Sequence, residues 1–161
     1  MSVFEYNFEQ YKSLSPDLYR KEKYNLQVEL LKLQEDVIKK KRKIAICFEG
    51  RDTAGKSSTI NFFSEHLIPS NFNYVHLGIP TKKERKNWFE RYETYLPNKG
   101  QIVLFDRSWY TRALTEPTLG YCSKKQYEEF MTKVNKWEKS LVKKGTEPVS
   151  YTHLTLPTTS S

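Results

Sequence analysis

A glycine-bounded loop between an apolar segment and a helical segment is the feature that most restricts what this sequence can form. Residues 50–57 read Gly-Arg-Asp-Thr-Ala-Gly-Lys-Ser and fit the P-loop pattern G-x-x-x-x-G-K-[ST] at every fixed position. The apolar run 44–48 precedes the loop, and a helix is predicted from Lys56. In this setting backbone N–H groups and the helix N-terminus surround phosphate oxygens. The motif therefore predicts a phosphate-binding site, with a plain glycine-rich connector as the alternative.

Each residue type in the loop has its own chemical use. Lys56 brings a point charge to the transferred or bridging phosphates, and the Ser57 hydroxyl can bind Mg²⁺. Asp52 is unusual, because a carboxylate repels phosphate unless it binds metal, takes a proton from the acceptor or points away. Loop capping by Asp52 is the alternative. The predicted phosphate-binding residues are Gly50, Arg51, Thr53, Ala54, Gly55, Lys56, Ser57, Ser58, Arg91 and Arg112.

A second apolar run, 101–105, ends directly on Asp106 and Arg107. Because the carboxyl ends of parallel strands share one edge of a sheet, Asp106 is expected beside the P-loop as a metal ligand. The Arg107 guanidinium suits phosphate oxygens and the charge of a transferring phosphoryl group. Arg112 is a further candidate for binding phosphate. The alternative is that it is a solvent-exposed residue of a helix. The predicted catalytic residues are Asp52, Lys56, Asp106 and Arg107, and the predicted metal ligands are Asp52, Ser57 and Asp106.

Apolar periodicity and capping signals predict alternating helices and strands. Thr81 with Glu84 and Ser123 with Gln126 have the spacing of capping boxes. Helices are expected at 19–41, 56–67, 81–95 and 123–144, and strands at 44–48, 74–77 and 101–105. This alternation predicts an α/β fold with a parallel sheet.

Composition limits the class of protein further. The chain has 161 residues, 37% of them hydrophobic, and a formal net charge of +8, which attracts polyanions without choosing among them. No membrane span, secretion signal or nucleic-acid motif is visible, and Cys47 and Cys122 form no zinc or disulfide pattern. We expect a cytoplasmic protein with no membrane or nucleic-acid partner. The basic run 39–43 is interpreted as a helix end rather than a nucleic-acid patch.

The character of the chain changes near its end. Residues 149–161 carry almost no charge and resemble the conceptual translation of a sequencing adapter. We therefore expect three segments: a lead-in at 1–18, a partial P-loop core at 19–148 and a non-native tail at 149–161. A short edge strand followed by a tail is the alternative for the last segment.

Two longer strings carry a resemblance to a known family. Residues 48–56 (Phe-Glu-Gly-Arg-Asp-Thr-Ala-Gly-Lys) and 104–113 (Leu-Phe-Asp-Arg-Ser-Trp-Tyr-Thr-Arg-Ala) resemble the second polyphosphate kinase family, and the resemblance covers roughly residues 20–147. It implies a three-layer α/β/α P-loop kinase core, similar to thymidylate kinase, with a helical lid and incomplete at its C-terminus. Arg112 and residues 116–122 would fall in the lid region.

The resemblance also implies a reaction, namely Mg²⁺-dependent phosphoryl transfer between inorganic polyphosphate and a nucleoside mono- or diphosphate such as ADP, GDP or AMP. Family members often self-associate, so a homo-oligomer is compatible with it. Two departures are a serine pair, Ser57-Ser58, in place of frequent glycines, and Thr111 in place of a common asparagine. The alternatives are an ATP-dependent nucleoside monophosphate kinase and an inactive phosphate-binding fragment.

Overall fold

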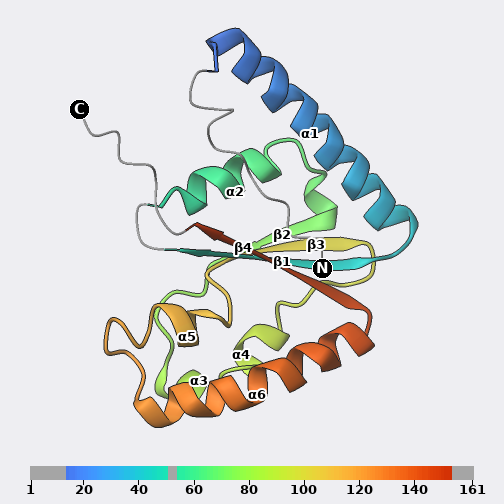
Figure 1. Ribbon diagram of the computed structural model, residues 1–161. Helices are drawn as coiled ribbons and strands as arrows, with labels where there is room; N and C mark the ends of the chain where they lie inside the picture. Colours follow the sequence, from blue (N-terminus) through green and yellow to red (C-terminus); the bar gives the residue numbers. More distant parts are fainter. Residues whose placement is uncertain (1–13, 51–53, 154–161) are drawn as a thin grey trace, which may run out of the picture.

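The computed structural model describes residues 14–50 and 54–153, which form a parallel sheet covered by helices on both faces (Figure 1). Arg51, Asp52, Thr53 and most of the predicted lead-in lie outside the described residues. The elements in chain order are α1 (Pro16–Lys39), β1 (Lys43–Gly50), α2 (Lys56–Ser64), a 3₁₀ turn η2 (Pro69–Asn71), β2 (Phe72–Val75), α3 (Lys82–Lys86), α4 (Glu90–Glu93), β3 (Gln101–Asp106), α5 (Thr111–Leu114), α6 (Lys124–Lys143) and β4 (Thr146–His153). The predicted α/β class is confirmed.

The four strands lie in the order β2-β3-β1-β4, and every pairing is parallel. β1 is therefore central, with β3 on one side and β4 on the other. All strands end at the same edge of the sheet, where the P-loop follows β1 and Asp106 closes β3. The order thus brings the two sequence motifs side by side, since Phe48 of β1 is paired with Asp106 of β3.

Alternating side chains of the buried strands supply two separate cores. On one face, Ile44, Ile46 and Phe48 pack with residues of α1 and α2. On the other face, Ala45 and Cys47 pack with large aromatic residues from α4, α6 and the loop after β3. Apolar residues on both faces explain the continuous apolar runs of β1 and β3, which strands covered on one face would not need.

The prediction of one continuous helix over 81–95 is wrong. The structure has α3 and α4 separated at Asn87–Phe89, and Asn87 leaves helical geometry at φ −109°, ψ 60°. Within this break, Trp88 is buried and donates its indole N–H to the Trp109 carbonyl at 2.9 Å. Packing of Trp88 therefore outweighs the continuous helix that the spacing indicated. Both predicted capping boxes are present, at Thr81 and Ser123.

Residues 149–153 belong to a strand in this structure. They complete β4 and pair with Ile46–Gly50 of β1. Tyr151 packs on Phe48, with ring centroids 5.7 Å apart. The edge-strand alternative thus describes their conformation, whereas the non-native origin of residues 149–161 stays a prediction.

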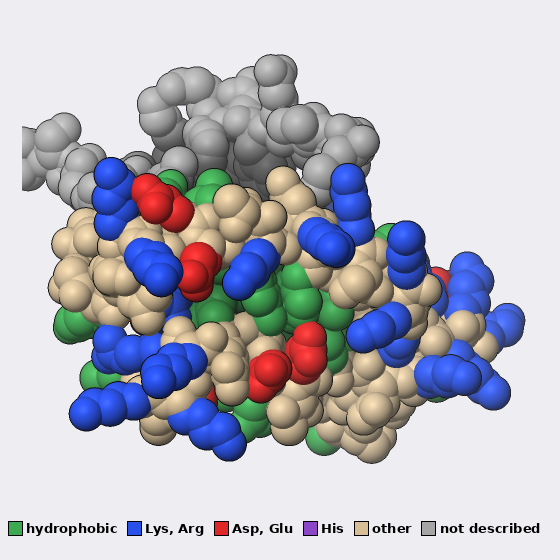
Figure 2. Space-filling view, turned by 90° about the horizontal axis from the view of Figure 1, so that it is seen from below, with side chains coloured by type: hydrophobic (Ala, Val, Ile, Leu, Met, Phe, Trp, Pro, Cys, Tyr) green, Lys and Arg blue, Asp and Glu red, His purple; other side chains and the backbone are tan. Residues whose placement is uncertain are grey.

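The face formed by α3, α4 and α6 is rich in lysine and arginine (Figure 2). α6 is an amphipathic helix whose buried residues are Phe130, Val134 and Leu141. Its outward positions include Lys125, Lys133 and Lys136, which are exposed. No described helix is long and apolar enough to cross a membrane.

Candidate active site

The P-loop joins β1 to α2 as the motif predicts. Gly50 ends the strand at φ 145°, and Gly55 caps the helix in the left-handed region at φ 83°, which a residue with a side chain adopts only at a cost. α2 then begins at Lys56, so the N-terminal end of the helix faces the loop. Lys56 is only 7% exposed, and its ammonium group donates to the Gly50 carbonyl at 3.1 Å. The lysine is thus held at the base of the loop.

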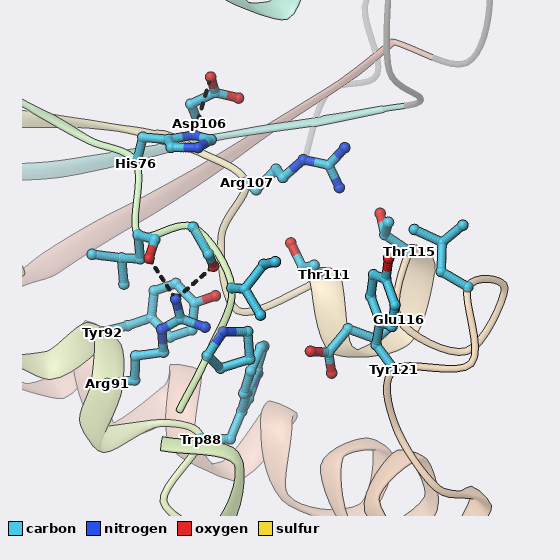
Figure 3. Close-up of a pocket in the computed structure, with 15 residues that line it drawn as sticks. His76, Trp88, Arg91, Tyr92, Asp106, Arg107, Thr111, Thr115, Glu116 and Tyr121 are labelled. Atoms are coloured by element: carbon cyan, nitrogen blue, oxygen red, sulfur yellow. Dashed lines mark hydrogen bonds and ion pairs between the residues drawn. The ribbon is translucent and has the colours of Figure 1, made fainter. Parts of the chain in front are cut away.

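Asp106 is the acidic side chain that the structure brings to the P-loop. It is 5% exposed, and three groups surround its Oδ2 atom. Figure 3 shows one of them, the His76 ring. The Tyr74 hydroxyl donates to Oδ2 at 3.0 Å, while Ser57 Oγ and His76 Nδ1 each lie 3.5 Å away. Burial, together with the hydrogen bond to Asp106, raises the pKa of Tyr74, so the phenol keeps its proton and acts as a donor.

The Asp106 carboxylate and the Ser57 hydroxyl are hard oxygen donors, which is the chemistry Mg²⁺ prefers. Among residues 14–50 and 54–153, no cluster of three His, Cys, Asp or Glu side chains could hold a metal ion. The donor set therefore fits an ion that takes few protein ligands and completes its shell with water and phosphate oxygens, as Mg²⁺ usually does.

Two pockets meet at Asp106 and Arg107. The first, called the P-loop pocket, has a volume of about 360 Å³ and is lined by residues 55–58, His76, Asp106 and Arg107. The second, called the aromatic pocket, has a volume of about 280 Å³ and extends from the end of β2 past Trp88 and Tyr92 to Tyr121 (Figure 3). His76, Asp106 and Arg107 line both pockets. A ligand in one pocket would therefore contact the same three side chains as a ligand in the other.

Arg107 has a strained backbone. Its φ of 64° lies in the left-handed region, which costs a non-glycine residue roughly 1–2 kcal/mol. The N–H of Arg107 donates to the Phe48 carbonyl at 3.0 Å, which ties β3 to β1 beyond the end of their pairing. Left-handed geometry at a residue with a side chain often marks a functional position.

Glu49 is a buried carboxylate that the sequence analysis did not single out. It is 1% exposed, and its Oε1 accepts hydrogen bonds from the Ser108 N–H at 2.6 Å and the Ser108 hydroxyl at 2.7 Å. Burial raises the pKa of Glu49 above its usual value, and these two hydrogen bonds oppose that rise. A charged residue between the apolar run 44–48 and the first P-loop glycine was the available sequence signal.

The predicted phosphate ligands Arg91 and Arg112 lie away from the P-loop. Arg91 lines the aromatic pocket, where its Nη2 donates to the carbonyls of Leu77 at 2.9 Å and Gly78 at 2.7 Å. Arg112 lines neither the P-loop pocket nor the aromatic pocket. It is 1% exposed, and its Nε lies 3.1 Å from Glu116 Oε2. The Arg112 guanidinium also sits 3.9 Å from the Trp88 ring centroid.

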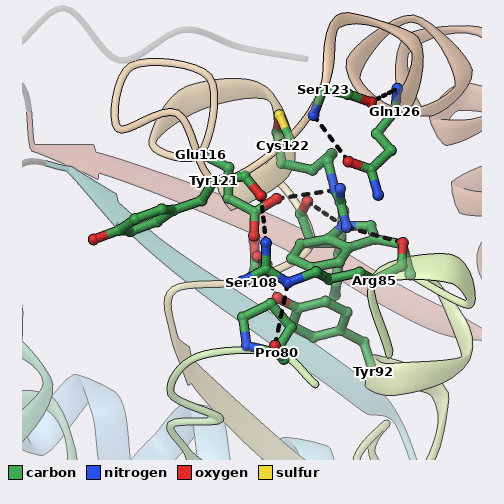
Figure 4. Close-up of polar contacts among 12 residues, drawn as sticks. Pro80, Arg85, Tyr92, Ser108, Glu116, Tyr121, Cys122, Ser123 and Gln126 are labelled. Carbon is green, nitrogen blue, oxygen red and sulfur yellow. Dashed lines mark hydrogen bonds and ion pairs between the residues drawn. The ribbon is translucent and has the colours of Figure 1, made fainter. Parts of the chain in front are cut away.

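The segment after α5 is held beside the aromatic pocket by arginine contacts (Figure 4). Arg85 donates through Nη1 to the Tyr121 carbonyl at 2.7 Å and through Nε to the Pro80 carbonyl at 3.3 Å. Arg112 donates to the Arg85 carbonyl at 3.2 Å. The two arginines therefore connect α3 to residues 116–121, which form one wall of the pocket.

A parallel sheet with a P-loop after its central strand, and an aspartate at the end of the neighbouring strand, defines the P-loop class of phosphate-binding proteins. A model of the polyphosphate kinase 2 (PPK2) family matches residues 13–156. The chain belongs to this family.

Curated relatives agree with the family match. The chain is 48% identical over 128 residues to a GDP-polyphosphate phosphotransferase of Mycolicibacterium smegmatis. The aligned region covers 79% of the chain and 45% of that protein. The chain is 43% identical over 139 residues to an ADP-polyphosphate phosphotransferase of Pseudomonas aeruginosa, covering 86% and 46%. The chain thus spans less than half the length of these relatives.

Solved structures give the same fold. A crystal structure assigned to polyphosphate kinase 2 from Pseudomonas aeruginosa PA01 superposes with a TM-score of 0.79 at 28% identity, covering 89% of this chain and 31% of that chain. Polyphosphate kinase 2 from Arthrobacter aurescens TC1 superposes with a TM-score of 0.78 at 21% identity, covering 88% and 52%.

Proposed function

We propose that this protein transfers a phosphoryl group between inorganic polyphosphate and a nucleoside mono- or diphosphate. The observation that carries the proposal is the junction of two pockets at Asp106 and Arg107. A phosphoryl group passing between a donor and an acceptor needs one point that both ligands reach. The names of the relatives, which include GDP- and ADP-polyphosphate phosphotransferases, support this choice of substrates.

The P-loop pocket is the proposed place for the transferring phosphates. Lys56 and the N-terminus of α2 favour anions there, and Arg107 adds a guanidinium that matches phosphate oxygens. Asp52 stays a proposed catalytic residue and metal ligand. Together these groups would position the phosphates and offset the charge of the transition state.

The aromatic pocket is the proposed place for the nucleoside. Trp88 and Tyr92 give it apolar, aromatic walls, and Arg91 and Glu116 add charge. Thr111, which stands in place of an asparagine common in the family, also lines this pocket. Its Oγ1 atom is buried and has no hydrogen-bond partner among the described residues. A nucleotide in this pocket would give the hydroxyl a partner.

Mg²⁺ is the proposed cofactor, held by Asp106 and Ser57, with Asp52 as a further candidate. When bound, the ion would supply positive charge that neutralises phosphate oxygens. The thiols of Cys47 and Cys122 are free, which supports a reducing compartment such as the cytoplasm as the proposed location.

The test uses two proteins: the chain itself, and the chain joined to the C-terminal half of a relative. Each is mixed with polyphosphate, Mg²⁺ and ADP, GDP or AMP. We expect the joined protein to form the phosphorylated nucleotide, and Lys56→Ala and Asp106→Asn to abolish this activity. Lys125→Ala, which removes an exposed lysine of α6, is the matched control. Transfer from ATP but not from polyphosphate would instead favour an ordinary nucleoside monophosphate kinase. Phosphate binding without turnover by the short chain alone would identify it as a binding fragment.

A further inference from the structure

Asp106 and Arg107 are consecutive, yet both line the P-loop pocket and the aromatic pocket. Successive side chains of a strand point to opposite faces of its sheet, so a continued β3 would direct Arg107 away from Asp106. The left-handed φ of 64° at Arg107 ends the strand and turns the guanidinium to the same side. The position of the guanidinium therefore depends on whatever holds this backbone conformation.

The contacts on either side of the Arg107 α-carbon come from the last residues of β1. The Arg107 N–H is bonded to the Phe48 carbonyl at 3.0 Å, and the next N–H, of Ser108, is bonded to Glu49 Oε1 at 2.6 Å. The Ser108 hydroxyl is bonded to the same oxygen at 2.7 Å. The Glu49 side chain, 1% exposed, lines neither the P-loop pocket nor the aromatic pocket. It is placed to act on Arg107 through the backbone.

We propose that Glu49 is a positioning residue for Arg107: its carboxylate holds the Ser108 backbone and hydroxyl, and so keeps the Arg107 guanidinium directed into the P-loop pocket. This proposal rests on the proposed function, because it takes phosphate to be the ligand of the P-loop pocket. Electrostatics alone would disfavour a carboxylate next to a phosphate site. A positioning role gives this carboxylate a use that outweighs its repulsion of the ligand.

Two conservative substitutions separate position from charge. Glu49→Asp keeps a carboxylate but is one methylene too short for the 2.6 and 2.7 Å contacts. Glu49→Gln loses the charge but keeps an oxygen that can accept both hydrogen bonds. The probe is inorganic tripolyphosphate, titrated by calorimetry into the full 161-residue chain. We expect Glu49→Asp to weaken binding on the order of tenfold, the loss of a charged hydrogen bond, and Glu49→Gln to rescue most of the affinity.

A double-mutant cycle tests whether the effect passes through Arg107. In an Arg107→Ala background, Glu49→Asp should cost no further affinity, because the guanidinium that it positions is gone. Glu35→Asp, at an exposed position of α1, is the matched control and should leave binding unchanged. If Glu49→Asp does not fold, Ser108→Ala should still weaken binding severalfold. It removes the 2.7 Å hydroxyl contact to Glu49, together with the 3.2 Å hydrogen bond that this hydroxyl accepts from the Tyr110 N–H.

Opposite behaviour overturns the inference. Three results would each exclude a positioning role. Glu49→Asp could bind tripolyphosphate as tightly as the parent chain, Glu49→Gln could bind it more weakly than Glu49→Asp, or the losses in the double-mutant cycle could be additive.

The backbone conformation has a separate readout. The amide NMR signals of residues 107 and 108 should move in Glu49→Asp and stay near their parent values in Glu49→Gln. Failure of the parent chain to bind tripolyphosphate would contradict the proposed function, while the NMR comparison still decides the role of Glu49.

Discussion

Among the described residues, Tyr74 makes the shortest side-chain contact with Asp106, a hydroxyl hydrogen bond donated to Oδ2 at 3.0 Å. Partners of this kind orient a metal-binding carboxylate, and their loss typically costs about 10–100-fold in metal affinity. We therefore expect Tyr74→Phe to weaken Mn²⁺ binding, measured by electron paramagnetic resonance with Mn²⁺ in place of Mg²⁺, by at least about tenfold. Tyr24→Phe, at a tyrosine 67% exposed on α1, should have no effect. Equal affinities for Tyr74→Phe and the parent chain would show that Asp106 does not depend on this hydroxyl.

The sequence predicted the placement of those site residues that belong to a motif with fixed spacing. Lys56, Ser57, Asp106 and Arg107 all line the P-loop pocket, as expected. Tyr74, His76 and Glu49 were missed because their roles arise from strand order rather than from spacing. Once β2 lies beside β3, the side chains at its carboxyl end reach Asp106, and nothing in the local pattern of residues 72–76 indicates that neighbour.

At the scale of single elements, the ends of α6 follow directly from its sequence. Ser123 accepts a hydrogen bond from the Gln126 N–H at 3.2 Å, and the Gln126 side chain accepts one from the Ser123 N–H at 2.9 Å. We expect Ser123→Ala to lower the free energy of unfolding by about 1 kcal/mol, measured by urea denaturation. Thr132→Ala, at an exposed position in the middle of α6, should not destabilise the protein, and an equal loss there would argue against capping as the cause.

Arg42 connects α1 to β4, the edge strand beside β1. Its guanidinium donates to both oxygens of Glu147 in β4, at 2.9 and 2.6 Å, and to Asp36 of α1 at 2.9 Å. The hydrogen bond from Arg42 lowers the pKa of Glu147 below its usual 4.5. A lowered acid pKa stabilises the fold above pH 4.5, and the contribution is lost as the pH falls through the folded-state value.

Glu147→Gln should therefore be less stable than the parent near neutral pH and equally stable in acid. Because Glu147 is 46% exposed, we expect a difference of less than about 1 kcal/mol in the free energy of unfolding at about pH 7. It should disappear at about pH 3, where the carboxyl is protonated in both states. Glu35→Gln, at an exposed carboxyl of α1, is the matched control. A difference that persists in acid would point to packing rather than charge.

The elements also show where local reasoning fails. The long helices and the strands β1 and β3 were predicted because their apolar spacing is sustained over many residues. The break between α3 and α4 was missed because it comes from Trp88, whose indole is drawn into the core by contacts with Trp109 and Tyr92. Such a contact over 21 residues of sequence leaves no trace in a helical pattern.

For the whole molecule, the decisive segment is the second half of β4. Its residues 149–153 pair with Ile46–Gly50, so they support the strand that leads into the P-loop. We expect removal of residues 149–161 to lower the free energy of unfolding by roughly 2 kcal/mol or more, through lost backbone hydrogen bonds and the lost Tyr151–Phe48 contact. Removal of residues 154–161 alone is the control. Equal stability of both truncated chains would mean that residues 149–153 contribute nothing to the fold.

The position of β1 at the centre of the sheet also sets the time at which the chain can fold. The Arg42–Glu147 contact joins residues 105 positions apart, so β1 leaves the ribosome long before its second neighbour has been made. At synthesis rates of about 5–20 residues per second, the wait is roughly 5–20 s. During this interval an apolar strand with an unpaired edge is exposed to other chains in the cell. Slow translation should therefore lower the yield of soluble protein, and a chaperone that covers β1 should restore it.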